Sequence, residues 1–170
     1  MLNMIKQKRV YIIAAIISMA LSVTFLFSMP SLKMSDDFST YEDLVDHSPI
    51  VVMATVTSGN KEFDYAEMTF AITEVEIIDH VRGDESAKTL QILQTRSEED
   101  PYLKKGTQVL LFLSEYNGPI AQNVYVINGL YNGQYVIDDG TLCTAKTANA
   151  KTTPLANTDL ESVILDVKNT

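Results

Sequence analysis

The sequence predicts a mainly β domain, a small closed barrel of five to six strands, with a short N-terminal helix, a C-terminal helix and one transmembrane helix ahead of the domain. Three observations support this fold class. About six short segments rich in Val, Ile and Leu are separated by turn residues. Two helix-capping signatures flank these segments. A long uncharged run precedes all of them.

The uncharged run extends from Val10 to Met29 and follows Lys6, Lys8 and Arg9. About twenty helical residues at a rise of ~1.5 Å each span about 30 Å, the thickness of the hydrocarbon core of a bilayer. Basic residues on only one side of the run favour a cytoplasmic N-terminus. We therefore expect a single-pass protein of the cell membrane whose remaining chain lies outside.

The run is expected to stay in the protein as a signal anchor. A cleaved signal peptide has an apolar region of ~7–15 residues and small residues at positions −3 and −1 of the cut. Cleavage after Ser28 would place Leu26 at −3, and cleavage after Ser31 would place Met29 there. A cleaved signal peptide, which would release a secreted domain, remains the alternative. The expected organisation is a cytoplasmic basic segment 1–9, a transmembrane segment 10–29, a spacer 30–38 and an extracytoplasmic domain 39–170.

The composition after Met29 limits the partners of the domain. Three of the 13 Lys and Arg residues precede the run and all 22 acidic residues follow it, so this region has a formal charge of −12. Such a charge repels phosphate backbones and anionic headgroups, which excludes nucleic acid as an expected partner. Cys143 is the only cysteine, so the chain has no internal disulfide. We expect it to be a half-buried structural thiol, with pairing to another chain as the alternative.

The N-terminal helix is predicted from a capping box, Ser39-x-x-Glu42, and it ends before Pro49. Ile50–Val56 then reads as the first strand, because it is a run of β-branched and apolar residues that ends in a turn. The segment Met68–Val81 is a longer strand. Its apolar residues change from even to odd positions, so we expect a β-bulge near Thr73–Glu74.

Five further strands and a helix complete the domain. Val109–Leu113 is apolar throughout and is expected at the centre of the sheet. A second capping box, Thr158-x-x-Glu161, opens a helix with apolar residues at i, i+3, i+4 and i+7, which should lie across one end of the barrel. The other expected strands are Leu90–Leu93, Val124–Ile127, Gln134–Ile137 and Thr141–Cys143.

Four further segments of the chain are informative: DLVDHSPIVV at 43–52, VEIIDHVRG at 75–83, YLKKGTQVLLFL at 102–113 and YNGQYVI at 131–137. They resemble segments of the netrin/tissue-inhibitor-of-metalloproteinase-like OB-fold domains of secreted bacterial proteins. The resemblance covers roughly residues 40–143 and implies an OB-like barrel. The animal inhibitors chelate a protease zinc through an N-terminal cysteine, and this domain has no cysteine near its start.

A cluster of tyrosines and asparagines supplies the candidate binding residues. Aromatic rings beside amide side chains can stack on, and hydrogen-bond to, a sugar or a peptide, and OB barrels bind ligands on a face or its loops. The charged loop Glu98–Asp100 would form a polar rim. The alternative is that the tyrosines are present because they favour strands, and that Asn-Gly is present because it forms turns. The candidate ligand-binding residues are Tyr116, Tyr125, Tyr131, Tyr135 and Asn132.

No catalytic or metal-binding motif accompanies this cluster. Neither His47 nor His80 has the spacing of a metal site, and no cofactor is expected. The expected function is therefore a non-enzymatic, membrane-anchored module that binds a protein or a cell-envelope polymer. The alternatives are an inhibitor-like domain that acts without an N-terminal cysteine, and an envelope enzyme whose residues converge only in the folded chain.

Overall fold

The computed structural model describes residues 38, 40–83, 86–95, 102–144 and 154–170. The predicted transmembrane segment 10–29 and residues 30–37 of the predicted spacer lie outside these residues. Within the described residues, no helix has the length and hydropathy needed to cross a membrane. The fold below is that of the unit that contains all described residues.

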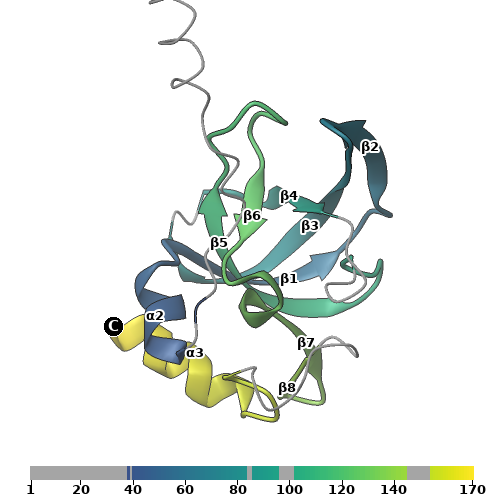
Figure 1. Ribbon diagram of the computed structural model, residues 1–170. Coiled ribbons are helices and arrows are strands. Elements are labelled where there is room, and N and C mark those ends of the chain that lie inside the picture. Colours follow the sequence, from purple (N-terminus) through teal and green to yellow (C-terminus); the bar gives the residue numbers. More distant parts are fainter. Residues whose placement is uncertain (1–37, 39, 84–85, 96–101, 145–153) are drawn as a thin grey trace, which may run out of the picture. The chain divides into compact units, whose positions relative to one another are not determined.

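The domain is mainly β, as predicted, with eight strands and two α-helices among the described residues (Figure 1). The helices are α2 (Tyr41–Asp46) and α3 (Leu160–Asn169), and a 3₁₀ helix, η1 (Leu130–Gly133), precedes β7. The strands are β1 (Ile50–Val56), β2 (Lys61–Tyr65), β3 (Met68–Arg82), β4 (Thr89–Thr95), β5 (Gln108–Glu115), β6 (Tyr125–Ile127), β7 (Gln134–Asp138) and β8 (Thr141–Thr144).

Five of these strands close into a barrel. The hydrogen-bonded order is β1-β3-β4-β6-β5, and β5 returns to pair with β1. Every pair is antiparallel except β4–β6. Taken in chain order, the first four barrel strands lie in the order 4-1-2-3, which is a Greek key. The prediction of a closed barrel of five to six strands is thereby confirmed.

The interior of the barrel is an apolar core to which all five strands contribute. Val52, Val75, Ile92, Leu111 and Ile127 represent β1, β3, β4, β5 and β6 in this cluster. Side chains alternate between the two faces of a strand, so the neighbours of these residues point outward. β5 is paired on both sides, with β1 on one side and β6 and β7 on the other, as expected for Val109–Leu113.

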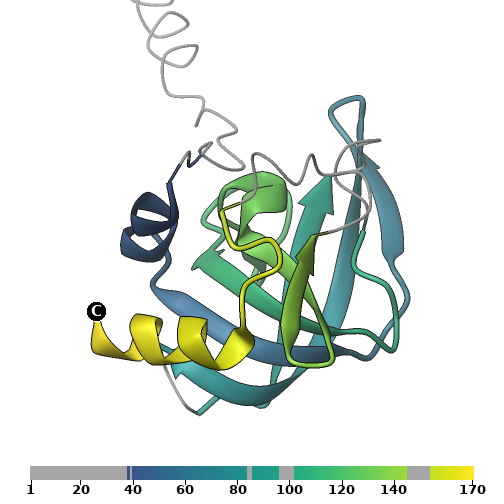
Figure 2. The same ribbon diagram turned by 90° about the horizontal axis from the view of Figure 1, so that it is seen from below.

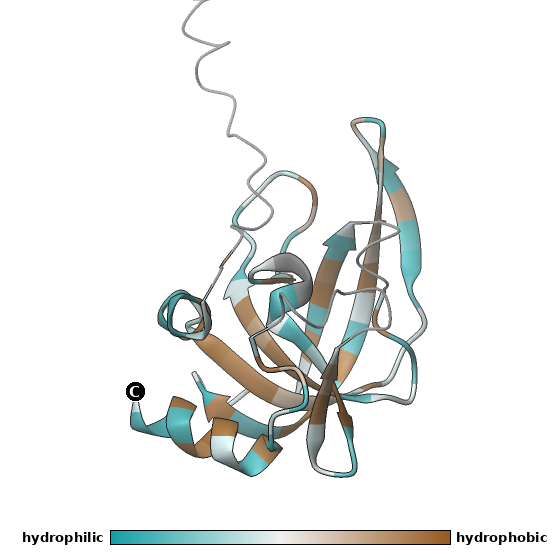
Figure 3. Ribbon diagram, turned by 60° about the horizontal axis from the view of Figure 1, so that its bottom comes forward, coloured by the Kyte–Doolittle hydropathy of each residue, from teal (hydrophilic) through white to brown (hydrophobic). Residues whose placement is uncertain are grey.

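A second apolar core covers the outer surface of β1 and β5. Val51, Leu110 and Phe112 point outward from these strands and pack against the buried faces of α2 and α3. Figure 2 shows both helices along this side of the barrel. α3 has alternating hydrophobic and hydrophilic sectors in Figure 3, as its predicted amphipathic pattern requires. The expectation that this helix closes one end of the barrel is wrong, because it packs on the outer wall.

The predicted β-bulge near Thr73–Glu74 is also wrong. The β3–β4 register runs without interruption from Phe70 to Glu76. The register shifts occur farther along β3, opposite β1, between Val51 and Val52 and between Met53 and Ala54.

The apolar pattern of β3 has another cause. Phe70 and Ile72 point outward like Glu74, but they pack in a third apolar cluster on the outside of the barrel. The change in the apolar pattern therefore marks the point at which the outer face of β3 becomes exposed. The inward and outward alternation of the side chains continues through it without a bulge.

Three local features differ from the sequence-based expectations. Both helix caps lie one residue later than predicted: Thr40 accepts a hydrogen bond from Asp43 N, and Asp159 accepts one from Ser162 N. β2 was not predicted, because Lys, Glu and Asp occupy three of its five positions. Such charged residues are typical of a strand that pairs on one side only, and within the described part of the chain β2 pairs with β3 alone.

Candidate functional site

A small pocket lies where β5 ends and β6 begins. Its volume is about 170 Å³, and it is lined by Glu115, Tyr116, Asn117, Asn123, Val124 and Tyr125. These residues come from the last residue of β5, the two ends of the β5–β6 loop and the first residue of β6. The loop begins and ends on a hydrogen bond from Tyr116 N to Val124 O (2.9 Å). The two walls of the pocket are therefore held together by main-chain pairing.

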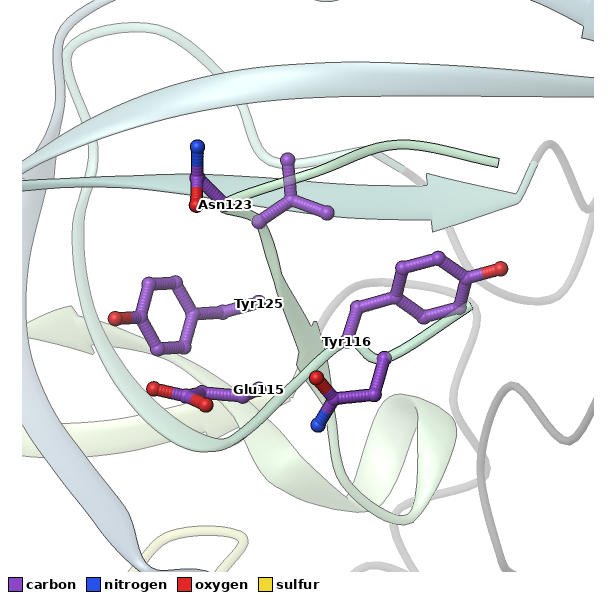
Figure 4. Close-up of a pocket in the computed structure, with 6 residues that line it drawn as sticks. Glu115, Tyr116, Asn123 and Tyr125 are labelled. Atoms are coloured by element: carbon purple, nitrogen blue, oxygen red, sulfur yellow. The ribbon is translucent and has the colours of Figure 1, made fainter. Parts of the chain in front are cut away.

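Glu115 and Tyr125 face each other across the β5–β6 pair. Directly opposed residues of an antiparallel pair project to the same side of the sheet. Figure 4 shows the carboxylate of Glu115 beside the ring of Tyr125, whereas the ring of Tyr116 points the other way. Glu115 is exposed and Tyr125 is half-buried. No hydrogen bond or ion pair of the Glu115 carboxylate is present among the described residues.

Asn123 completes the turn into β6. Its φ angle is +56°, in the left-handed region that asparagine tolerates better than most residues. Its side chain is exposed at the pocket, as is that of Asn117. The pocket therefore combines one carboxylate, two tyrosine rings and two amides. These groups can accept hydrogen bonds from a ligand and contact its apolar part.

The β5–β6 loop also packs on the outside of the barrel. Tyr116, Ile120 and Ala121 of the loop contact the outer cluster formed by Phe70, Leu93, Val124 and Val126. Phe63 of β2 packs against the same cluster. The β5–β6 loop and the β2–β3 hairpin thus pack on the same apolar cluster, and both extend from the same end of the barrel in Figure 1.

The β2–β3 hairpin ends in a strained turn. Ala66 (φ +48°) and Glu67 (φ +67°) both occupy the left-handed region, although neither is glycine. The flanking Tyr65 and Met68 are among the largest exposed apolar side chains, at 37% and 45% exposure. A two-residue turn with this backbone matches the twist of the flanking strands. The hairpin therefore presents apolar surface close to the loop that carries the pocket.

The structure brings together only two of the five predicted site residues. Tyr116 and Tyr125 line the pocket. Tyr131 lies in η1, and its side chain is outside the described residues, as is the predicted rim Glu98–Asp100. Tyr135 is fully buried and Asn132 is 3% exposed, so neither faces a ligand.

Tyr135 is a core residue. It lies in the cluster beneath α2 and α3, with its ring 6.3 Å from that of Phe112 in an edge-to-face arrangement. Burial raises the pKa of the Tyr135 hydroxyl above its usual range, because the phenolate would lose its hydration. The position of Tyr135 therefore supports the alternative interpretation, in which the residue is present because tyrosine favours β-strands.

The asparagines near η1 tie the N-terminal helix to the barrel. Asn132 donates to Phe38 O (2.9 Å). The amide nitrogen of Asn128 lies 2.9 Å from His47 O, 3.0 Å from Ser48 Oγ and 2.9 Å from Ser114 Oγ. Buried amides with several partners specify one arrangement of the surrounding chain. These asparagines therefore position α2 relative to β5 and β6.

The free energy of unfolding of two variants distinguishes the core residue Tyr135 from the pocket residue Tyr125. We expect Tyr135→Ala to lower the free energy of unfolding by about 3–5 kcal/mol, as for other large-to-small core substitutions. Tyr125→Ala, at the half-buried pocket, should cost less than about 1.5 kcal/mol. Urea denaturation followed by circular dichroism gives both values. Equal losses for the two variants would contradict this assignment.

Other reactive side chains lie apart. Within the described residues, no three His, Cys, Asp or Glu side chains gather as metal ligands. The ring of His47 stacks on Phe38 at 4.9 Å, and His80 Nε2 lies 2.9 Å from Ala87 O. Cys143 is a free, half-buried thiol in β8, as expected for its exposure.

Sequence reasoning missed Glu115, Asn117 and Asn123 as site residues. Glu115 reads as an ordinary strand end, and only its pairing with Tyr125 across the sheet reveals a common site. An acidic residue one position before the Tyr116-Asn117 turn was the available signal. No protein-family model and no curated protein sequence matches this chain.

Proposed function

We propose that this chain is a membrane-anchored, extracytoplasmic binding module with an OB-like barrel. Its ligand-binding surface is the pocket at the β5–β6 loop together with the adjacent β2–β3 hairpin. The ligand is a protein or a cell-envelope polymer. The observation that carries the proposal is the position of the pocket in the barrel.

The topology supports this choice of surface. OB folds are five-stranded Greek-key barrels that bind ligands on the face of strands 2 and 3 and on the loops between strands 1 and 2 and between strands 4 and 5. Counting only the five barrel strands, the β5–β6 loop is the connection between strands 4 and 5. The β2 hairpin lies in the connection between strands 1 and 2. Both candidate elements thus occupy positions at which such barrels bind.

The dimensions of the pocket support binding more than catalysis on a small molecule. Sites for small-molecule substrates usually have volumes of about 300–1,000 Å³. The pocket here measures about 170 Å³ and is formed by two strand ends and a loop. This space suits a single side chain or sugar substituent of a larger ligand.

The membrane anchor rests on the amino-acid sequence. Val10–Met29 is uncharged and long enough to span a bilayer, and basic residues precede it. A region with a formal charge of −12 is repelled by anionic lipid, so the anchor supplies the attachment.

Site-specific photocrosslinking tests the proposed surface. A benzophenone side chain is placed at Asn117 in the full-length chain, expressed in its native membrane, and illuminated. The matched control carries the same group at Asp139, which is also exposed but lies in the β7–β8 turn. We expect a discrete crosslinked product from position 117 that is absent from position 139. Products of equal size and yield from both positions, or none from position 117, would reject this surface.

A further inference from the structure

We propose that the pocket at the β5–β6 loop binds the side-chain cation of a Lys or Arg residue in a partner protein. This inference deepens the proposed function and rests on it, since it names the chemistry of the group that enters the same pocket. It follows from the arrangement of Glu115 and Tyr125, from the charges around them and from the size of the pocket.

The Glu115–Tyr125 pair offers the two contacts that a cation on a flexible chain uses best. A carboxylate accepts short, charge-assisted hydrogen bonds from ammonium and guanidinium groups. An aromatic ring attracts the same cations to its face. The two groups lie directly opposite each other on neighbouring strands, so one cation reaches both. Among the described residues, the Glu115 carboxylate has no basic partner.

The shape of the site suits a long side chain better than a compact ion. Buried Val124 and half-buried Tyr125 both line the pocket, so the aliphatic stem of Lys or Arg meets apolar surface. The amides of Asn117 and Asn123 are exposed at the same pocket. They are placed to hydrogen-bond the main chain that carries the bound side chain.

The surrounding charges favour a cationic partner. Residues 61–76, which form β2, the hairpin turn and the first part of β3, carry Glu62, Asp64, Glu67, Glu74 and Glu76 against one basic residue, Lys61. Two of the other basic residues are engaged on the opposite side of the barrel: Arg82 binds helix carbonyls, and Lys168 pairs with Asp79. Acidic surface around a site speeds the encounter with basic ligands and repels acidic ones.

The test uses the full-length protein in lipid nanodiscs and a fluorescent decapeptide with four lysines separated by Gly and Ser. Fluorescence anisotropy measures its affinity. Two matched decapeptides carry acetyl-lysine or glutamate at the same four positions. Chitosan oligomers, which carry the ammonium group on a sugar, are the competitor that represents an envelope polymer. Because the lysine peptide differs from the acetyl-lysine peptide only in charge and an acetyl group, their ratio reports recognition of the cation.

We expect the lysine peptide to bind at least tenfold more tightly than the acetyl-lysine peptide. Glu115→Gln should weaken its binding about tenfold, through loss of a charge-assisted contact. Tyr125→Leu should weaken it about threefold, through loss of the cation–π contact. The matched control Glu76→Gln removes the same charge from the outer face of β3, outside the pocket, and should change affinity less than twofold. Circular dichroism confirms that each variant is folded.

Four outcomes would contradict different parts of the proposal. Equal weakening by Glu115→Gln and Glu76→Gln would show that only the overall charge matters, and would overturn the pocket assignment. Equal affinity for lysine and acetyl-lysine peptides would overturn the cation while leaving the crosslinking result, and hence the binding module, intact. Direct binding of a fluorescently labelled chitosan oligomer, without binding of the lysine peptide, would replace the protein partner with a polymer. Absence of both binding and crosslinking would reject the proposed function itself.

Discussion

Gly133→Ala is expected to lower the free energy of unfolding by about 3 kcal/mol or more, in the upper range for overpacking of a closed interior. Gly133 ends η1 and leads into β7. A methyl group there would overlap the main-chain oxygen of Asn128 and press on Ile127. Neither can move freely, because Asn128 N donates to Phe112 O and its side chain holds α2. Urea denaturation of the purified protein measures the loss.

Gly59→Ala is the matched control for this steric argument. Gly59 lies between β1 and β2, and no atom outside its chain neighbours would contact the added methyl group. Its backbone does not require glycine either, since its φ angle is outside the left-handed region. We expect stability to be unchanged or to rise by about 0.4–1 kcal/mol, because alanine restricts the unfolded chain. Similar losses for both variants would show that the clash with Asn128 does not explain the loss at Gly133.

Arg82→Met is the second substitution with a large expected effect, a loss of about 2–3 kcal/mol. Arg82 Nη1 donates to Val45 O (2.6 Å) and Nη2 donates to Val167 O (3.3 Å). These carbonyls lie in the last turns of α2 and α3, where the helix dipole favours a positive charge. Methionine keeps much of the stem but leaves both carbonyls without this partner. Thermal and urea denaturation report the change.

Lys168→Met separates this role from simple loss of a positive charge. Lys168 also lies near the end of α3, and its ammonium group is 3.2 Å from Asp79, but 45% of its side chain is exposed. Exposed ion pairs contribute about 0–1 kcal/mol, so we expect a loss below this limit. If Lys168→Met proved as costly as Arg82→Met, the paired helix carbonyls would not explain the role of Arg82.

The contacts that hold the helices lie in a different part of the domain from the pocket. Arg82 joins the two helices on the outer wall of β1 and β5, while Asn128 joins α2 to β5 and β6. Tyr116 and Val124 of the pocket, and Phe63 of the β2–β3 hairpin, pack instead in the outer cluster that contains Phe70 and Leu93. Ligand-facing side chains can therefore be changed without breaking the contacts that hold the helices.

The element positions could be predicted from the amino-acid sequence to a large extent. The predicted first strand, Ile50–Val56, has the bounds of β1, and the predicted strands Gln134–Ile137 and Thr141–Cys143 correspond to β7 and β8. Strand and turn patterns depend on neighbouring residues, so a local reading is sufficient for them. These local patterns did not predict β2, because an edge strand needs no apolar face of its own.

The binding residues could be predicted only in part. Tyr116, Tyr125 and Tyr135 have the same side chain, and nothing local distinguishes the two that line the pocket from the one in the core. The difference arises from which face of each strand another element covers. α2 and α3 bury the surroundings of Tyr135, whereas the start of β6 stays open at Tyr125.

The sequence by itself determined the mainly β character of the domain, most of its strands and both helices, and it alone carries the predicted membrane segment at Val10–Met29. These properties follow from short-range patterns of apolar, turn and capping residues. Only the tertiary structure decided that Glu115 lies opposite Tyr125, that Phe70 and Ile72 pack outside the barrel and that Tyr135 is buried. The physical reason is that burial and pairing depend on strands that meet across the sheet, however far apart they lie along the chain.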